Sequence, residues 1–119
     1  MNPATTSTAA QDSAGLLPAR PLAAQAHALR AAAAFIERTG LAGLSVTADD
    51  DGICITVPRS AGSPAARAGT VTYLAALTGA PCPQHRDYPS WAWVSTIGRI
   101  AGHHARISTT IEPDEQETA

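Results

Sequence analysis

Apolar residues recur every three to four positions between residues 22 and 39, which is the period of an amphipathic helix. Pro21 fits the first turn of such a helix, and Gly40 fits its left-handed C-cap. The stripe expected to face the core consists of Leu22, Ala26, Leu29, Ala33 and Ile36. We therefore expect the first element of the fold to be a helix that ends at Thr39.

Apolar and polar residues then alternate with period two, which is typical of a strand with one buried face. The alternation covers residues 44–48 and 53–57, and the run Asp49-Asp50-Asp51-Gly52 between them has the composition of a turn. A four-residue loop puts the apolar side chains of both strands on one face of a hairpin. The aspartates are interpreted as the turn, because the ligand spacing of a calcium loop is missing.

A second helix is expected after this hairpin. It opens at Ser63-Pro64, an N-cap followed by a proline at the first helical position, and it runs through Thr78 with Gly79 as its C-cap. Its apolar side consists of Val71, Leu74 and Leu77, with Tyr73 and Ala75 at the margins. The helical period therefore predicts one face of this helix against the core.

Residues 80–89 contain three prolines and are interpreted as a linker to a second hairpin, with strands at 91–100 and 103–111. The order of elements is helix-strand-strand twice over, αββαββ. It predicts an α+β fold, a four-stranded antiparallel sheet with two helices packed on one face. This is the order that a ferredoxin-like chain acquires when its first strand moves to the end.

The length of 119 residues has room for one domain. We expect it to span residues 21–112. Residues 1–20 are rich in Ala, Thr, Ser and Pro without periodicity and are expected to form a disordered N-terminal arm. Residues 113–119 are expected to form an acidic, solvated and disordered tail.

Composition excludes several classes of protein. The net charge of −2 argues against bulk electrostatic attraction to nucleic acid or anionic lipid. Cys54 and Cys82 are too few for a disulfide framework. No signal peptide and no run of roughly 20 apolar residues is present, so we expect a cytoplasmic protein that does not enter a membrane.

Residue types suited to recognition are concentrated in the second hairpin. If Ala101-Gly102 is a two-residue turn, Ile97 stands on the solvent side of the sheet with the candidate binding residues, which are Trp91, Trp93, Arg99, His104 and Arg106. These side chains would form an aromatic and cationic platform suited to stacking on bases or on the surface of a partner.

A turn of three residues, or a bulge at Gly98, reverses the pairing and puts both tryptophans in the core beside Ile107 and Ile111. The alanine-rich helices leave volume that large side chains fill, which favours this second register with buried tryptophans. A one-residue shift cannot be decided from the pattern, so both registers remain open.

No enzyme or metal site is predicted. Cys82-x2-His85, with His103 and His104 further on, has the residue types of a zinc site, but adjacent histidines on a strand point to opposite faces. No nucleophile elbow and no glycine-flanked serine motif is present. We therefore expect no metal, no cofactor and no catalytic residue.

The order helix, hairpin with Asp-Asp-Gly, helix, followed by Trp91-x4-Thr-Ile-Gly-Arg-Ile-Ala-Gly-His-His-Ala-Arg-Ile-x-Thr109, spans residues 22–111. It resembles small proteins of unknown function that are common in Streptomyces-type actinomycetes, often on phages and integrative elements. The resemblance implies an accessory factor of such a host or of its mobile elements. Together with the platform, it predicts a small non-enzymatic binding or interaction protein that contacts a protein partner or a second copy of itself. The alternative is a nucleic-acid-binding regulator that uses the same face.

Overall fold

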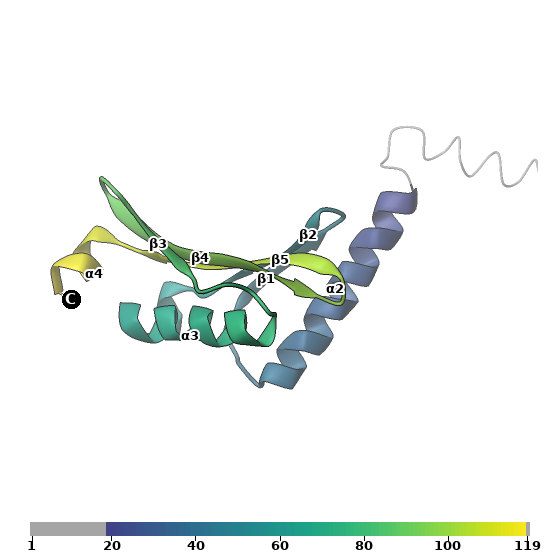
Figure 1. Ribbon diagram of the computed structural model, residues 1–119, viewed down its shortest axis with the longest axis horizontal. Helices are drawn as coiled ribbons and strands as arrows, with labels where there is room; N and C mark the ends of the chain where they lie inside the picture. Colours follow the sequence, from purple (N-terminus) through teal and green to yellow (C-terminus); the bar gives the residue numbers. More distant parts are fainter. Residues whose placement is uncertain (1–18, 119) are drawn as a thin grey trace, which may run out of the picture.

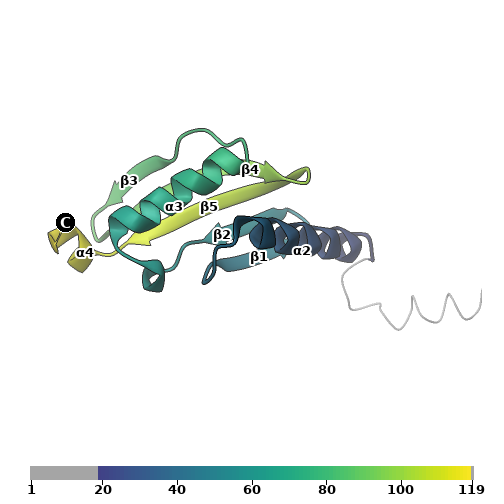
Figure 2. The same ribbon diagram turned by 90° about the horizontal axis from the view of Figure 1, so that it is seen from below.

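A computed structural model describes residues 19–118 of the chain, in which two helices cover one face of a five-stranded sheet (Figure 1). The elements in chain order are α2 (Ala19–Thr39), β1 (Ser45–Asp49), β2 (Gly52–Thr56), the 3-10 turn η1 (Arg59–Ala61), α3 (Pro64–Leu77), β3 (Gln84–Tyr88), β4 (Trp91–Ile100), β5 (His103–Ile111) and α4 (Pro113–Thr118). The predicted N-terminal arm lies outside the described residues up to residue 18. Seen from below, α3 lies over β4 and β5, and α2 lies over β1 and β2 (Figure 2).

The first hairpin has the predicted register. Val46 pairs with Ile55 and Ala48 with Ile53, so the apolar side chains share the face that the helices cover. Ile53 and Ile55 are buried there. The period-two alternation therefore predicted both the strands and their orientation correctly.

The strands lie in the order β1-β2-β5-β4-β3, and the central neighbours β2 and β5 run parallel. The α+β class and the two helices on one face agree with the sequence-based prediction. The predicted four-stranded, fully antiparallel sheet of a permuted ferredoxin-like chain is wrong in both strand number and strand direction.

This difference comes from β3, which lies inside the segment 80–89 that was interpreted as a linker. β3 pairs antiparallel with β4 at the edge of the sheet and adds one reversal of the chain between α3 and β5. With this reversal the number of direction changes after β2 is even, so β5 runs in the same direction as β2. Without β3 that number would be odd and the two central strands would be antiparallel.

Helix α2 reaches the core through a different stripe from the predicted one. Its buried residues are Ala28, Ala32 and Phe35. Leu22 and Leu29 of the predicted stripe are 63% and 47% exposed. Alanine occupies so many positions of α2 that several stripes share the helical period, and the stripe that carries the bulky Phe35 faces the sheet.

Helix α3 packs on β4 and β5. Its buried apolar residues are Val71, Leu74 and Ala75, whereas Leu77, predicted to face the core, is 49% exposed. The backbone N–H of Arg99 in β4 donates to the carbonyl of Thr78 at the end of α3 (3.1 Å). Gly98 permits this close approach, because a Cβ there would lie 2.6 Å from the Cβ of Thr78.

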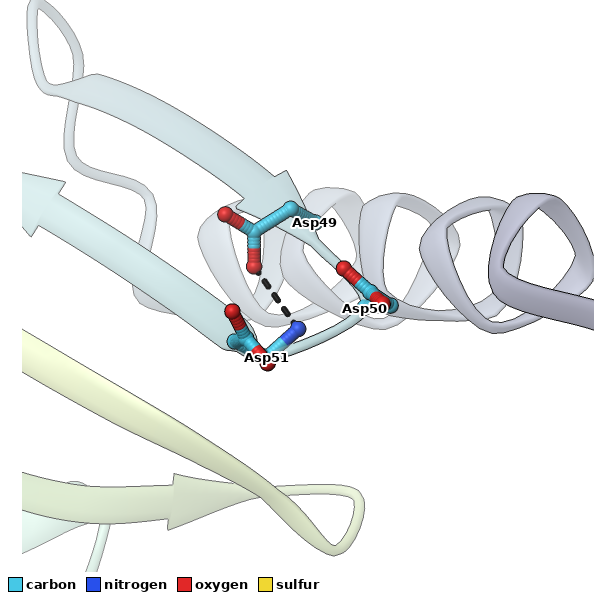
Figure 3. Close-up of side chains that lie close together, drawn as sticks. All are labelled: Asp49, Asp50 and Asp51. Atoms are coloured by element: carbon cyan, nitrogen blue, oxygen red, sulfur yellow. Dashed lines mark hydrogen bonds between the residues drawn. The ribbon is translucent and has the colours of Figure 1, made fainter. Parts of the chain in front are cut away.

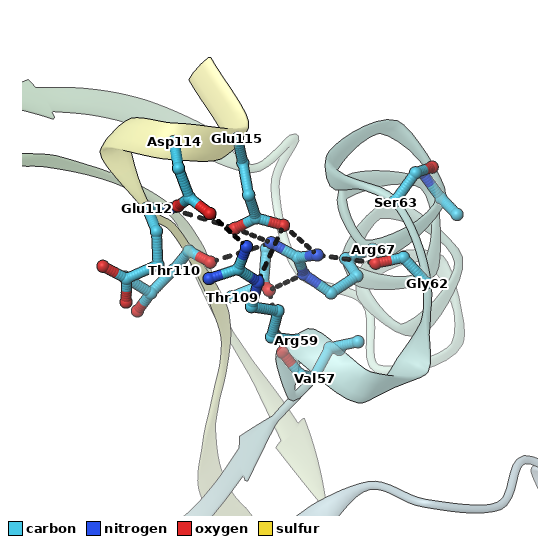
Figure 4. Close-up of polar contacts among 11 residues, drawn as sticks. Val57, Arg59, Gly62, Ser63, Arg67, Thr109, Thr110, Glu112, Asp114 and Glu115 are labelled. Atoms are coloured by element: carbon cyan, nitrogen blue, oxygen red, sulfur yellow. Dashed lines mark hydrogen bonds and ion pairs between the residues drawn. The ribbon is translucent and has the colours of Figure 1, made fainter. Parts of the chain in front are cut away.

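Arg67 of α3 is fully buried beside α4 (Figure 4). Its guanidinium donates to Thr109 Oγ1 (3.1 Å), the carbonyls of Gly62 (2.6 Å) and Thr110 (3.0 Å), and both carboxylate oxygens of Glu115 (2.8 and 2.9 Å). These five bonds use the full donor capacity of an arginine. The prediction of a solvated tail is therefore wrong at Glu115, because a buried guanidinium requires a counter-charge and Glu115 supplies it.

Candidate functional site

The β4–β5 register decides between the two arrangements of the tryptophans. Arg99 pairs with His104, and Trp93 pairs with Thr110, without a bulge between them. The turn has two residues, Ala101 (φ 49°) and Gly102 (φ 84°), and two positive φ angles are typical of a tight type I′ hairpin turn. The interpretation with buried tryptophans is therefore wrong, and the two-residue turn is correct.

We use the term open face for the side of β3, β4 and β5 that the helices leave uncovered. Its side chains, from strand to strand, are Gln84, Arg86 and Tyr88; Trp91, Trp93, Ser95, Ile97 and Arg99; and His104, Arg106, Ser108 and Thr110. All three strands lie within the described part of the chain, and none of these positions holds an acidic residue. The open face is thus positively charged on a chain whose net charge is −2.

The structure brings two of the predicted binding residues into direct contact. The guanidinium of Arg106 lies 5.9 Å from the centre of the Trp93 ring, within the range of a cation–π interaction. Arg106 reaches Trp93 across Ser95 and Ser108, whose short side chains occupy the row between them. This covering explains why Ser108 is buried although no helix lies above it.

The other three predicted residues lie at the two ends of β4. Trp91 stacks on Tyr88, with ring centres 4.3 Å apart and an interplanar angle of 16°. Arg99 and His104 stand opposite each other beside the turn, where Arg99 donates to the carbonyl of Gly102 (3.3 Å). The five predicted residues therefore share the open face but do not form one cluster.

Strand β3 contributes residues to the open face that sequence reasoning missed. Arg86 pairs with Trp93, and Tyr88 pairs with Trp91, so both extend the aromatic and cationic surface by one strand. Gln84, Arg86 and Tyr88 do alternate with His85 and Asp87, which was the available signal. It was weak because every residue of this edge strand is exposed, and neither face has an apolar pattern.

A hollow of about 340 Å³ lies on the open face around Trp93. The residues that line it include Trp93, Ile97, Arg86 and Arg106. Ser95, between Trp93 and Ile97 on β4, is small enough to leave this space. The hollow therefore combines a π surface with two positive charges.

A second hollow, of about 400 Å³, shares Ile97 and Arg106 with the first and extends to β1 and β2. Asp49, Asp51 and His104 also line it, so its charges are mixed. Arg106 therefore stands between a purely cationic hollow and one with both signs of charge.

The three aspartates of the first hairpin form the turn that the sequence predicted (Figure 3). Asp49 Oδ1 accepts hydrogen bonds from the backbone N–H groups of Asp51 (2.8 Å) and Gly52 (3.1 Å). Ligand atoms of Asp49, Asp50 and Asp51 lie within 4.8 Å of one another, and all three residues are exposed. Such a cluster is explained by turn chemistry, because an aspartate that bonds to its own following backbone stabilises a turn.

The histidines lie apart from one another, except for one pair. His103 points to the helix side and its Nε2 lies 2.6 Å from Nδ1 of His27 in α2. His104 points to the open face, as expected for its neighbour on a strand. His85 contacts Asp87 on the outer strand β3 (2.9 Å). The zinc-type residues of the sequence are therefore not brought together.

Comparison of the chain with protein-family models, with curated proteins and with solved structures gives no match. Within residues 19–118, no helix has the length and apolar character needed to cross a membrane.

Proposed function

We propose that this chain is a small non-enzymatic binding protein whose open face contacts a negatively charged macromolecule. The observation that supports this most directly is the arginine–tryptophan cluster around the hollow, formed by Arg86, Trp93 and Arg106. Tryptophan and arginine are the side chains that contribute most to binding surfaces. No acidic side chain on β3, β4 or β5 neutralises these arginines from the same face.

The positive charge of the open face also indicates which kind of partner it binds. A second copy of this chain, packed open face to open face, would bring two sets of arginines together, and like charges across an interface cost free energy. A negatively charged partner is therefore favoured over self-association through this face. The acidic character of the rest of the chain has the same effect, because it repels that partner from other surfaces.

The double variant Trp93→Ala/Arg106→Ala tests the proposal. It should lose the bound partner while its helical circular-dichroism signal stays unchanged, because both side chains stand outside the core. The measurement is affinity enrichment from the source cells, in which bound protein and bound nucleic acid are both quantified against wild type. The matched control is Tyr73→Ala/Arg30→Ala, which removes an exposed aromatic and an exposed arginine from the helix layer.

A partner retained by the open-face variant, or lost equally by the helix-layer variant, would sink the proposal. Unfolding of the double variant would mean that the tryptophan is part of the core. The origin indicated by the sequence resemblance, an accessory factor of an actinomycete or its mobile elements, belongs to this proposal. So does a cytoplasmic location, with which the unpaired thiols of Cys54 and Cys82 are compatible.

A further inference from the structure

We infer that the partner of the open face is a single-stranded nucleic acid, with a base stacked on Trp93 and its phosphates bound by the arginines around it. This inference rests on the proposed function and names its partner class. Arg86 and Arg106 line the same hollow as Trp93, so one nucleotide can meet the ring and a guanidinium at once. Bases stack on aromatic side chains in sequence-independent binding of single strands, and arginines follow the backbone.

The aromatic residues distinguish this partner from an acidic peptide. Carboxylates of a peptide would need only the arginines, whereas the open face also presents Tyr88, Trp91 and Trp93 along one side. A base has a π face for such a ring, and an aspartate or glutamate side chain has none. The polar groups of Gln84 and Ser95 lie at the same hollow and can bond to base edges.

A duplex fits the open face less well than a single strand. Paired bases are stacked on one another and do not offer their faces to a side chain on a sheet. The aromatic rings would then find no partner, and only the phosphate contacts of the arginines would remain. If bases stack on these rings, the chain should bind a single strand more tightly than the duplex of the same sequence.

The net charge of −2 does not oppose this inference, because none of the residues that line the hollow around Trp93 is acidic, and Asp49 and Asp51 line only the second hollow. Asp114 and Glu115 form ion pairs with Arg59 of η1 and with Arg67 near the start of α3. Asp87 points away from the open face beside His85. Arg86 on the edge strand and Arg99 beside the turn, which makes one bond to the Gly102 carbonyl, lie outside the second hollow and can meet phosphates.

The experiment is a titration of the full chain against fluorescein-labelled oligothymidylate and oligouridylate of about ten nucleotides, a length within the range of known single-strand sites. Intrinsic tryptophan emission is a second readout, since a base stacked on Trp93 quenches it. With three arginines on phosphates, the slope of log K against log salt should be about −2, at roughly 0.7 per contact. The two oligonucleotides distinguish DNA from RNA as the source of the strand.

The test variants remove side chains that line the hollow around Trp93. Trp93→Ala should weaken binding about tenfold or more, because the stack on one base is lost. Arg86→Gln should bring the salt slope to about −1.4, since one phosphate contact is removed. Tyr73→Ala and Arg30→Gln, an exposed aromatic and an exposed arginine on the helix layer, should change neither value. Arg86→Gln keeps the test decisive if Trp93→Ala fails to fold, because Arg86 is fully on the surface of an edge strand.

Several outcomes overturn the inference. Absence of binding at low salt, equal binding of the duplex, or equal binding of a poly-glutamate peptide would each exclude a stacked single strand. In those cases the proposed function still stands if the open-face double variant loses a protein partner that wild type retains. If the open-face and helix-layer variants behave alike with every partner, both the inference and the proposed function fail.

Discussion

Arg67 donates every hydrogen of its guanidinium within the chain, to groups on β5, the η1–α3 junction and α4. One side chain thus joins segments that are far apart in the sequence. Arg67, Val71 and Leu74 follow the helical period, so a charged residue occupies the apolar stripe of α3. In hindsight this was a signal that some carboxylate must be buried beside it, although the sequence does not say which one.

The pH dependence of stability should report this ion pair. The hydrogen bonds from Arg67, together with the backbone N–H of Glu112, lower the pKa of Glu115 from 4.5 to about 2. A lowered pKa in the folded state means that the contribution is fully present above pH 4.5 and is lost as pH falls toward 2. At neutral pH, Glu115→Gln should lower Tm by at least about 12 °C, since it leaves a buried charge without its counter-charge.

Thermal unfolding followed by circular dichroism at a series of pH values measures this effect. The gap in Tm between wild type and Glu115→Gln should close between pH 4.5 and 2. Glu112→Gln removes the same charge from an exposed neighbouring position and serves as the control. A gap that does not change with pH would show that the two residues are not ion-paired in solution.

At the scale of the element, the contact between α3 and β4 depends on Gly98. An added Cβ there would collide with Thr78, so Gly98→Ala should destabilise the fold by about 1–3 kcal/mol, the usual cost of overpacking. Gly69 in the middle of α3 is the matched control, because its Cβ would meet nothing within 4 Å. Gly69→Ala should stabilise by about 0.5–1 kcal/mol through helix propensity. Chemical denaturation measures both, and effects of the same sign would contradict this packing.

Elements with a clear period were predicted correctly, and those without one were not. The first hairpin alternates over both strands, which is why its register could be derived. Strand β3 has polar residues on both faces, and its pairing depends on the backbone of β4, which leaves no trace in its side-chain pattern. Of the binding surface, the residues of β4 and β5 were therefore found, and Arg86 and Tyr88 of β3 were missed. The face of α2 that contacts the sheet was predicted wrongly, because alanine is found on both the buried and the exposed face of this helix and does not distinguish them.

At the scale of the whole molecule, the charge of the open face differs in sign from the net charge of the chain. The open face holds Arg86, Arg99 and Arg106 without an acidic side chain on the same side of β3, β4 and β5, whereas the chain as a whole is negative. A sum over the composition argues against phosphate binding, but a partner experiences only the local potential within about 10 Å at ordinary salt. This is why total charge was a poor guide to the partner class.

Quenching of tryptophan fluorescence tests this local potential. Both tryptophans of the chain stand half-buried on the open face, and the guanidinium of Arg106 lies 5.9 Å from the centre of the Trp93 ring. Iodide should therefore quench their emission at least about twofold more strongly than caesium at low ionic strength, and added inert salt should reduce the difference. Arg86→Gln/Arg106→Gln should reduce it as well. Stronger quenching by caesium would contradict a positive open face, and no quenching by either ion would contradict the exposure of the rings.

The parallel pairing of β2 and β5 has a consequence for how the chain folds during synthesis. Ile53 pairs with Ala105, and Ile55 with Ile107, so each central contact joins residues 52 positions apart in the sequence. Contacts of such long range form slowly, because the loop between them must close first. Strand β5 (residues 103–111) must therefore emerge from the ribosome before β2 can pair with it. Until then α2, β1 and β2 form an incomplete unit with an unpaired strand edge, and we expect the nascent chain to depend on chaperones at this stage.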